Sequence, residues 1–182
     1  MALEPQELEA IHAREMIRDC VARVARGEDR RDRDLLKTAY WPGAAMDYGI
    51  FAGDLDAYLD WIVPGSPAVL LTQHFIGQTL IAVEGDTAKA ESHVIAYHRV
   101  DYGSEHRDLA MGGRYLDSFE KRDGQWRIAA RTMLYDWSQD IGQAADFSEG
   151  LMGAPFSAGH FTGRTTGDFS AEFFGKALEG TK

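Results

Sequence analysis

The order of sequence patterns along the chain is the strongest constraint on its fold. Helical spacings of apolar residues occupy the chain up to Val63, whereas alternating, β-rich runs fill residues 70–137. Helices followed by a long meander of strands are typical of an α+β domain in which the helices pack on one face of a curved antiparallel sheet. A chain of 182 residues suffices for one such domain with a tail and is short for two independent cores.

Three helices and one brief strand are expected before the meander. They are a helix from Glu4 to Arg26 that ends at Gly27, a short helix from Leu35 to Trp41 that ends at Pro42-Gly43, a strand from Ala44 to Tyr48, and a helix from Leu55 to Val63 capped by Gly53-Asp54. In the first helix, acidic residues gather near the start and arginines near the end, as the helix dipole favours.

Four strands are expected in the meander. The runs are Thr72–Val83, Thr87–Val100, Leu109–Glu120 and Gln125–Trp137. Gly85-Asp86 and Asp123-Gly124 separate neighbouring runs, and such pairs between β-rich segments are a strong hairpin signal. We therefore expect a domain from residue 1 to residue 137.

The segment 138–182 differs in composition from the rest of the chain, because it is rich in glycine and phenylalanine. One helix is expected in it, from Ser170 to Leu178. Six phenylalanines in it would be costly to leave in water, namely Phe147, Phe156, Phe161, Phe169, Phe173 and Phe174. We expect an extended arm that folds over its own subunit or over a neighbouring one.

The composition limits the classes of partner that this protein is expected to bind. The net charge of −10 and the pI near 5.0 disfavour nucleic acid, and no apolar run approaches the roughly 20 residues of a membrane helix. Cys20 is the only cysteine, which fits a reducing cytoplasm, and the N-terminus lacks the features of a signal peptide. We expect a cytoplasmic protein whose partner is a small molecule.

Four segments resemble the SnoaL-like branch of the nuclear-transport-factor-2-like superfamily. They are Glu28 to Tyr40, Met46 to Gly53, Thr72-x-His74-x-Ile76-Gly77, and Gly112 to Arg131, and the resemblance covers roughly residues 5–137. It implies a cone-shaped α+β barrel. Relatives of this branch include scytalone dehydratase, bile acid 7α-dehydratase and hexachlorocyclohexane dehydrochlorinase, and the fold also hosts isomerases, hydrolases and noncatalytic binders.

The resemblance implies that His74 is a general base that projects into the cone, and that Asp29 pairs with it. By strict alternation, His74 shares a strand face with Thr72, Ile76, Gln78 and Leu80. An aspartate that accepts the Nδ1 proton would orient the ring and leave Nε2 free to take a proton. Asp32 and Asp34 compete with Asp29 for this role, although Asp32 also suits a helix cap.

Tyr48, His98 and Arg131 match further positions of the family. A phenol or an imidazolium can donate to a developing oxyanion, and a guanidinium can hold a leaving anion. Two positions depart from the family pattern: Glu28 replaces a tyrosine of some dehydratases, and Val24 replaces a lysine of the dehydrochlorinase. Chloride elimination is therefore disfavoured.

Four more residues share the alternation that would point Arg131 inward, namely Met111, Tyr115, Met133 and Tyr135. They indicate either a roomy, partly aromatic cavity or an ordinary barrel core. His93 and His98 should face opposite ways on their strand, and no histidine or cysteine set has the spacing of a zinc site, so no metal site and no cofactor are expected.

The sequence thus favours a cofactor-independent lyase that acts on a cyclic or aromatic substrate. Dehydration and retro-aldol loss of a small aldehyde are the two versions considered. The alternatives are an isomerase that shuttles a proton in the same pocket, and a noncatalytic small-molecule binder. A homo-oligomer is expected, with a trimer ahead of a dimer because the dehydratases that the chain resembles are trimers.

Overall fold

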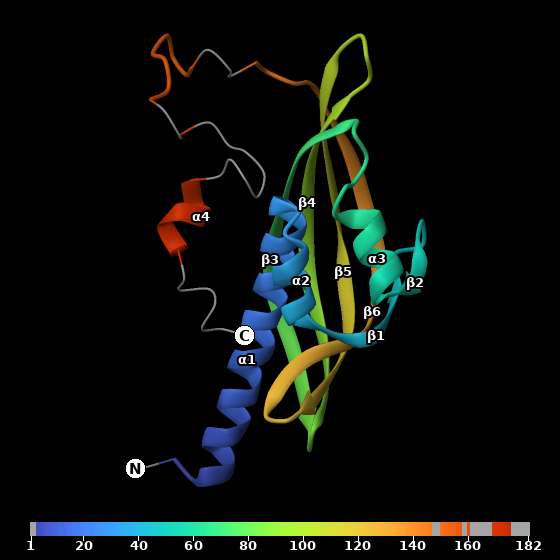
Figure 1. Ribbon diagram of the computed structural model, residues 1–182, viewed down its shortest axis with the longest axis vertical. Coiled ribbons are helices and arrows are strands. Elements are labelled where there is room, and N and C mark those ends of the chain that lie inside the picture. The colour runs from blue at the N-terminus through green and yellow to red at the C-terminus, as the bar shows by residue number, and fades with distance from the viewer. Residues whose placement is uncertain (1–2, 147–149, 158–159, 161–168, 176–182) are drawn as a thin grey trace.

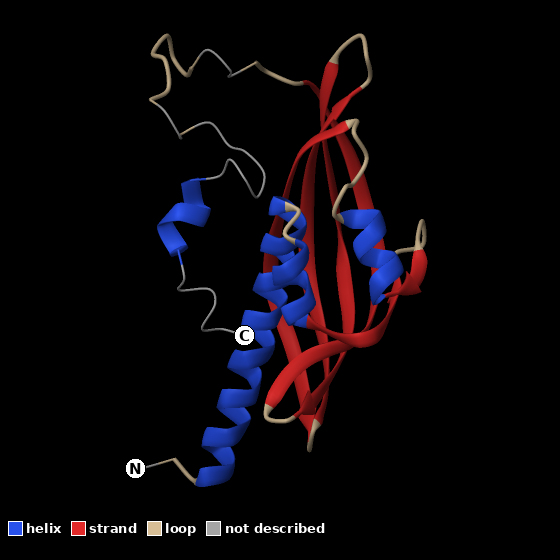
Figure 2. Cartoon of the chain, viewed as in Figure 1, coloured by secondary structure: helices blue, strands red, loops and turns tan. Residues whose placement is uncertain are grey.

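The computed structural model describes residues 3–146, 150–157, 160 and 169–175. The elements are α1 (Pro5–Arg30), α2 (Arg33–Ala39), β1 (Tyr40–Asp47), β2 (Ala52–Asp54), α3 (Leu55–Ile62), β3 (Val69–Glu84), β4 (Thr87–Asp101), β5 (His106–Arg122), β6 (Gln125–Gln143) and α4 (Phe169–Phe174). The expected α+β architecture is confirmed, because helices lie against one side of a curved six-stranded sheet (Figures 1 and 2).

The sheet has the strand order β2-β1-β6-β5-β4-β3. The expected meander forms its larger part, since β3, β4, β5 and β6 pair antiparallel in sequence order. One pair departs from the antiparallel expectation: β1 lies parallel to β6. This arrangement is possible because α3 and the meander intervene between the two strands and return the chain in the same direction.

Helix α1 is longer than expected. It passes through Gly27 and continues to Arg30, and Arg31 then adopts the left-handed conformation that ends it (φ 51°). Gly27 has a packing role inside the helix, since a Cβ there would lie 2.7 Å from the Leu36 side chain. The missing side chain lets α2 approach α1 closely, which compensates for the ~1 kcal/mol that glycine costs in a helix.

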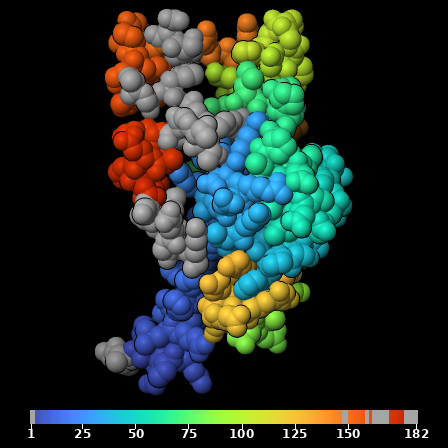
Figure 3. Space-filling model, in the orientation of Figure 1, coloured from blue at the N-terminus to red at the C-terminus, as the bar shows by residue number. Residues whose placement is uncertain are grey.

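The apolar stripe of α1 is buried over only part of its length. Ile17, Cys20, Val21 and Val24 are buried against the sheet, whereas Leu8 and Ile11 are each 52% exposed. Figure 3 shows the first turns of this helix, in dark blue, at one end of the molecule. The helix is therefore anchored by its C-terminal half, which is the half that carries Asp29.

Two smaller predictions had different outcomes. Asp32 caps α2 and Asp54 caps α3, each by accepting a backbone N–H at 3.0 Å, as expected. Helix α2, however, ends at Ala39 rather than at Pro42-Gly43, because Tyr40 already belongs to β1 and is fully buried. Burial of this strand in the sheet overrides the local helical pattern.

A bulge in β3 corrects the predicted strand face. The register with β4 shifts between Ile76 and Thr79, so His74 and Ile76 face inward while Gln78 and Leu80 face outward. Leu80 is 75% exposed. An extra residue in a strand reverses the alternation beyond it, so the pattern holds only up to Ile76.

The last strand passes the expected domain boundary at residue 137 and continues to Gln143. Beyond it, α4 contacts α1, where the Arg26 guanidinium donates to Ser170 Oγ at 3.2 Å and lies over the Phe174 ring. The expected helix over Ser170–Leu178 is observed over Phe169–Phe174, and residues 176–178 lie outside the described residues. Phe147 and Phe161 lie outside them too.

Candidate functional site

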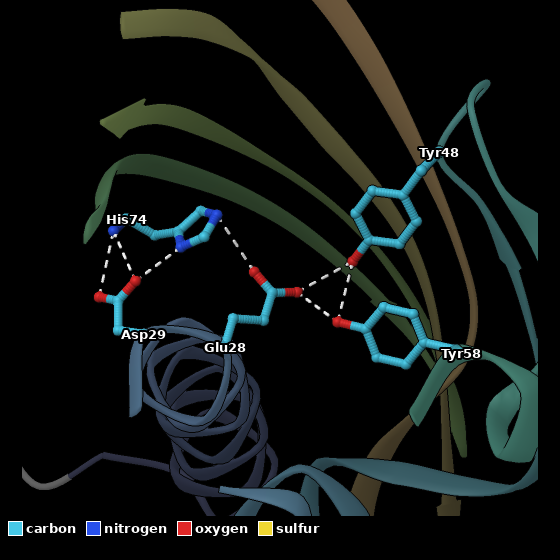
Figure 4. Close-up of polar contacts among 5 residues, drawn as sticks. All are labelled: Glu28, Asp29, Tyr48, Tyr58 and His74. Atoms are coloured by element: carbon cyan, nitrogen blue, oxygen red, sulfur yellow. Dashed lines mark hydrogen bonds and ion pairs between the residues drawn. The ribbon is translucent and has the colours of Figure 1, made fainter. Parts of the chain in front are cut away.

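The last turn of α1 brings Asp29 onto His74 of β3 (Figure 4). Asp29 Oδ1 lies 2.8 Å from His74 Nδ1, and the backbone N–H of His74 donates to both carboxylate oxygens at 3.0 and 3.1 Å. Because the backbone group can only donate, it holds Asp29 as an acceptor. Asp29 thereby fixes both the strand and the ring, and the hydrogen on Nδ1 is assigned from this geometry.

A second carboxylate reaches the other nitrogen of the same ring. Glu28 Oε2 lies 3.3 Å from His74 Nε2, and the Glu28 side chain is only 2% exposed. Consecutive residues of a helix project about 100° apart. Glu28 and Asp29 therefore approach the imidazole from two sides, one at each nitrogen.

The two carboxylates decide the charge of His74. Burial lowers the pKa of the imidazole, but the charges of Glu28 and Asp29 outweigh burial and raise it above its ordinary value of 6.5. The two carboxylates therefore favour the protonated form of the ring.

Glu28 is in turn held by two phenols. Tyr48 Oη donates to Glu28 Oε1 at 3.0 Å, and the Tyr58 hydroxyl donates to the same oxygen. The two rings are stacked with centroids 5.5 Å apart. Burial and the nearby Glu28 carboxylate raise the pKa of both phenols well above the usual value, so both stay protonated and act as donors.

A cavity of about 390 Å³ opens beside His74 and Glu28. Seven of the residues that the sequence singles out line it, namely His74, Tyr48, His98, Met111, Tyr115, Met133 and Tyr135. Other lining residues include Ile50, Trp61, Val69 and Thr72. A cavity of this size, mostly apolar and with a few converging polar groups, has the features of a small-molecule site.

Two of the predicted residues lie elsewhere. Asp29 is behind the His74 ring, on the side of a second groove between α1 and β3. Arg131 does not line the cavity. Its side chain is fully buried beside the Tyr115 ring, with the guanidinium carbon 3.9 Å from the ring centroid, and forms two hydrogen bonds to Asp117 at 2.7 and 2.8 Å.

Three residues of the site were missed by sequence reasoning. Glu28 stands in the sequence only as a departure from the family pattern, and Tyr58 and Trp61 lie in the expected helix from Leu55 to Val63 with no role in the site assigned to them. The signal for Glu28 was its place beside Asp29, but it stood in a run of charges that is typical of a solvated surface. Among the described residues, no group of three His, Cys, Asp or Glu side chains has an arrangement suited to a metal ion.

Comparisons place this geometry in a known family. The SnoaL-like domain matches residues 9–132. The comparison with curated proteins gives no match. In the part of the chain that is described, no helix is long and apolar enough to cross a membrane.

Solved structures share the fold at low sequence identity. Hexachlorocyclohexane dehydrochlorinase LinA-type3 from Novosphingobium barchaimii superposes with a TM-score of 0.67 at 19% identity, covering 83% of this chain and 98% of that one. A putative scytalone dehydratase from Novosphingobium aromaticivorans gives 0.60 at 23%, covering 82% and 97%. A nuclear transport factor 2-like protein from Salmonella enterica gives 0.63 at 14%, covering 75% and 99%. With the family match over most of the folded region, the chain belongs to the SnoaL-like domain family, and it shares the fold of the nuclear transport factor 2-like protein.

Proposed function

We propose that this protein is a cofactor-independent lyase that acts on a small cyclic or aromatic substrate through proton transfer by the Asp29–His74 pair. The observation that carries this proposal is the 2.8 Å contact between Asp29 Oδ1 and His74 Nδ1 at the wall of a cavity of about 390 Å³. Simple burial of a ligand requires neither group. A buried imidazole oriented by a carboxylate supports proton transfer at neutral pH.

Dehydration of a cyclic or aromatic alcohol is the leading version of this proposal, and retro-aldol loss of a small aldehyde is the close variant. The aromatic and thioether side chains of Tyr115, Tyr135, Met111 and Met133 on the cavity wall support a ring-shaped substrate. His98 lies near His74, with ring centroids 6.1 Å apart, and is assigned a hydrogen bond that orients the leaving hydroxyl. We leave Arg131 out of this step because Asp117 holds its guanidinium behind the cavity wall.

Reaction in deuterated water with mass spectrometry tests the reaction class. Candidate cyclic and aromatic alcohols are incubated with the enzyme, and the masses of substrate and products are followed. A lyase produces loss of water or of a small aldehyde. Exchange of hydrogen for deuterium with no other mass change would instead establish an isomerase, and tight binding without any turnover would establish a binder.

His74→Ala tests the base. General-base catalysis contributes roughly 10²–10⁴-fold, so the variant should lose at least ~10² in kcat. His93→Ala is the matched control, because His93 lies on the other face of the sheet with its side chain 47% exposed. A His74→Ala enzyme that keeps the rate of the His93→Ala control would remove His74 from the mechanism.

We also propose that the chain assembles as a homotrimer through the outer face of the sheet. Phe75, Ile95, Gly112 and Trp137 form a row across four strands by direct strand pairing. Phe75 is 67% exposed, Ile95 45% and Trp137 46%, and an exposed apolar patch of this kind favours a protein contact.

Light scattering should give three times the chain mass of 20.2 kDa. Ile95→Lys should dissociate the assembly, and a 20.2 kDa species in the wild type would refute it.

A further inference from the structure

Glu28 is a buried acid whose position the family resemblance does not explain. Its side chain is 2% exposed, yet it lines the cavity. Among the described residues, neither a lysine nor an arginine pairs with it, and His74 is the cationic partner. A buried carboxylate without compensation is costly, so its retention here has to be explained by its neighbours or by its use.

The hydrogen bonds around His74 limit what the ring can accept. Asp29 takes the hydrogen on Nδ1, and Glu28 Oε2 lies 3.3 Å from Nε2. This second contact is an ion pair, and two lone pairs facing each other at 3.3 Å would repel, so we infer that one proton sits on either Nε2 or Oε2. In both arrangements Glu28 is the acidic group nearest to Nε2 and competes with a substrate for that nitrogen. Glu28 Oε2 keeps a second lone pair.

The other oxygen of Glu28 is held in place. Oε1 accepts from the hydroxyls of Tyr48, which directly follows β1, and Tyr58 of α3, while the carboxylate itself projects from α1. Three segments of the fold thus fix one carboxylate, as Figure 4 shows. Such fixation is what a group needs if it is to meet a substrate in a defined geometry.

We propose that Glu28 is the residue that exchanges the proton with the substrate, and that His74 is its positively charged partner rather than the group that contacts the reacting hydrogen. This inference rests on the proposed lyase function and deepens it. Asp29 then orients and charges His74, and the two phenols orient Glu28.

The elimination step balances with these groups alone. Glu28 takes a proton from a C–H bond of the substrate, and the bonding electrons form a carbon–carbon double bond as the C–O bond breaks. The departing hydroxide takes a proton from the Glu28–His74 pair and leaves as water, so the pair gains one proton and loses one. In the retro-aldol variant, Glu28 takes the proton of a hydroxyl, the C–C bond breaks, and the aldehyde leaves while the new carbanion takes that proton.

The charge of the site indicates the substrate class. Two carboxylates face one imidazolium at His74, so this end of the cavity carries an excess negative charge. Arg31 also lines the cavity, but its guanidinium is held by backbone carbonyls at and before the start of β3. An anionic group would be repelled there. We infer a substrate whose reacting end is neutral and bears a hydroxyl group.

The first test needs no substrate. The full-length protein is labelled with ¹⁵N-histidine, and the ring nitrogens of His74 are followed against pH in the wild type, in Glu28→Gln and in Glu91→Gln. Glu91 is the matched control, since it lies 3.8 Å from His93 on the outer face. The titratable and charged groups around His74 and its cavity are Glu28 and Asp29 of α1, Arg31 after α1, Tyr48 after β1, Tyr58 of α3, His98 of β4, Tyr115 of β5, and Arg131 and Tyr135 of β6.

Removal of the Glu28 charge should lower the pKa of His74, and removal of the Glu91 charge should leave it unchanged. The signal of His74 is assigned by its loss in His74→Asn. An unchanged His74 titration in Glu28→Gln would overturn the shared proton on which the proposal depends. Circular dichroism of each variant checks that it is folded. If Glu28→Gln does not fold, Tyr58→Phe takes its place, because it removes one hydrogen-bond donor to Glu28.

The second test is turnover of a substrate found for the wild type. Glu28→Gln should lose at least ~10² in kcat with a much smaller change in KM, and Glu28→Asp should recover part of the loss. Glu91→Gln should keep the wild-type rate. A Glu28→Gln enzyme with wild-type kcat, alongside an inactive His74→Ala, would refute the role of Glu28 and leave the lyase function standing. A wild type without turnover on any substrate would refute the lyase function, and the His74 titration would then decide whether Glu28 controls the proton.

Discussion

Two buried clusters of charge in this protein differ in what they face. His74 and Glu28 line the cavity with Asp29 behind the His74 ring, and the His74 side chain is 10% exposed. Arg131 and Asp117 form an ion pair between β6 and β5 whose side chains are both 0% exposed. The first cluster has an open side that a substrate can reach. The second is sealed by protein on every side.

The difference in surroundings produces a difference in chemistry. Arg131 donates two hydrogen bonds to the Asp117 carboxylate. Burial lowers the pKa of the guanidinium, but the charge of Asp117 outweighs burial and raises that pKa well above its usual value. The guanidinium therefore keeps its charge. His74 has two acidic partners that raise its pKa above the ordinary value, and it lies beside a cavity. A buried charge that meets an opposite charge thus stabilises the fold, whereas a buried titratable group beside a cavity is able to exchange a proton with a ligand.

Replacement of Arg131 should have the largest effect on stability. Arg131→Met leaves Asp117 buried and unpaired, which costs about 3–5 kcal/mol of the free energy of unfolding. Urea denaturation followed by tryptophan fluorescence measures the loss. Arg107→Met is the control, because Arg107 pairs with Asp140 on the surface and should matter little. If the two variants lose similar stability, the sealed pair has no special structural role.

Replacement of His74 should separate activity from stability. His74→Ala is expected to lose at least ~10² in kcat, while its free energy of unfolding falls less than that of Arg131→Met, since water can enter from the cavity and solvate the remaining carboxylates. The same urea denaturation, run beside an activity assay, checks both parts. A loss of stability equal to that of Arg131→Met would mean that the two clusters do not differ in the way described.

The pH dependence of stability should report on His74. Its pKa in the folded state is raised above 6.5, so the folded protein binds the proton more tightly than the unfolded chain. This contribution is fully present below pH 6.5 and is lost as the pH rises through the folded-state value. Each unit of elevation corresponds to about 1.4 kcal/mol. Urea denaturation from pH 5.5 to 9 should show this decline in the wild type and a smaller one in His74→Ala; identical slopes would contradict it.

The thiol of Cys20 offers the finest probe of the sealed region. Burial raises its pKa to about 12, Asp117 and Arg131 are among the charges that act on it, and Sγ donates to the Ala39 carbonyl at 3.1 Å. Because Cys20 is the only cysteine, a thiol reagent reports on it alone. Labelling of the native protein should be slow, faster in Arg131→Met, and nearly unchanged in His74→Ala. Equal acceleration in both variants would show that the two clusters open together.

Local patterns were enough to predict much of the fold. The order of helices and strands, the caps at Asp32 and Asp54 and the hairpins of the meander depend on interactions between neighbours in the chain. The contact between Asp29 and His74 came from the resemblance to the family, not from any local pattern. The structure places these residues together.

The strand faces were predicted less well, for a physical reason. Alternation specifies a face only while the register is unbroken, and the bulge between Ile76 and Thr79 turns Leu80 outward. Arg131 likewise shares the inward alternation of the cavity residues, yet it lies behind Tyr115 because Asp117 of the neighbouring strand binds it. Pairing between strands decided its position.

The sequence by itself determined which residue types stand where, and hence the α+β class, the caps and the family to which the chain belongs. Only the tertiary structure decided that α1 continues past Gly27, because the close approach of Leu36 favours a glycine within the helix. That extension carries Glu28 to the second nitrogen of His74 and into reach of two phenols from other elements. Contacts between residues 20 to 46 positions apart have no local signature, since they depend on how helices and strands pack.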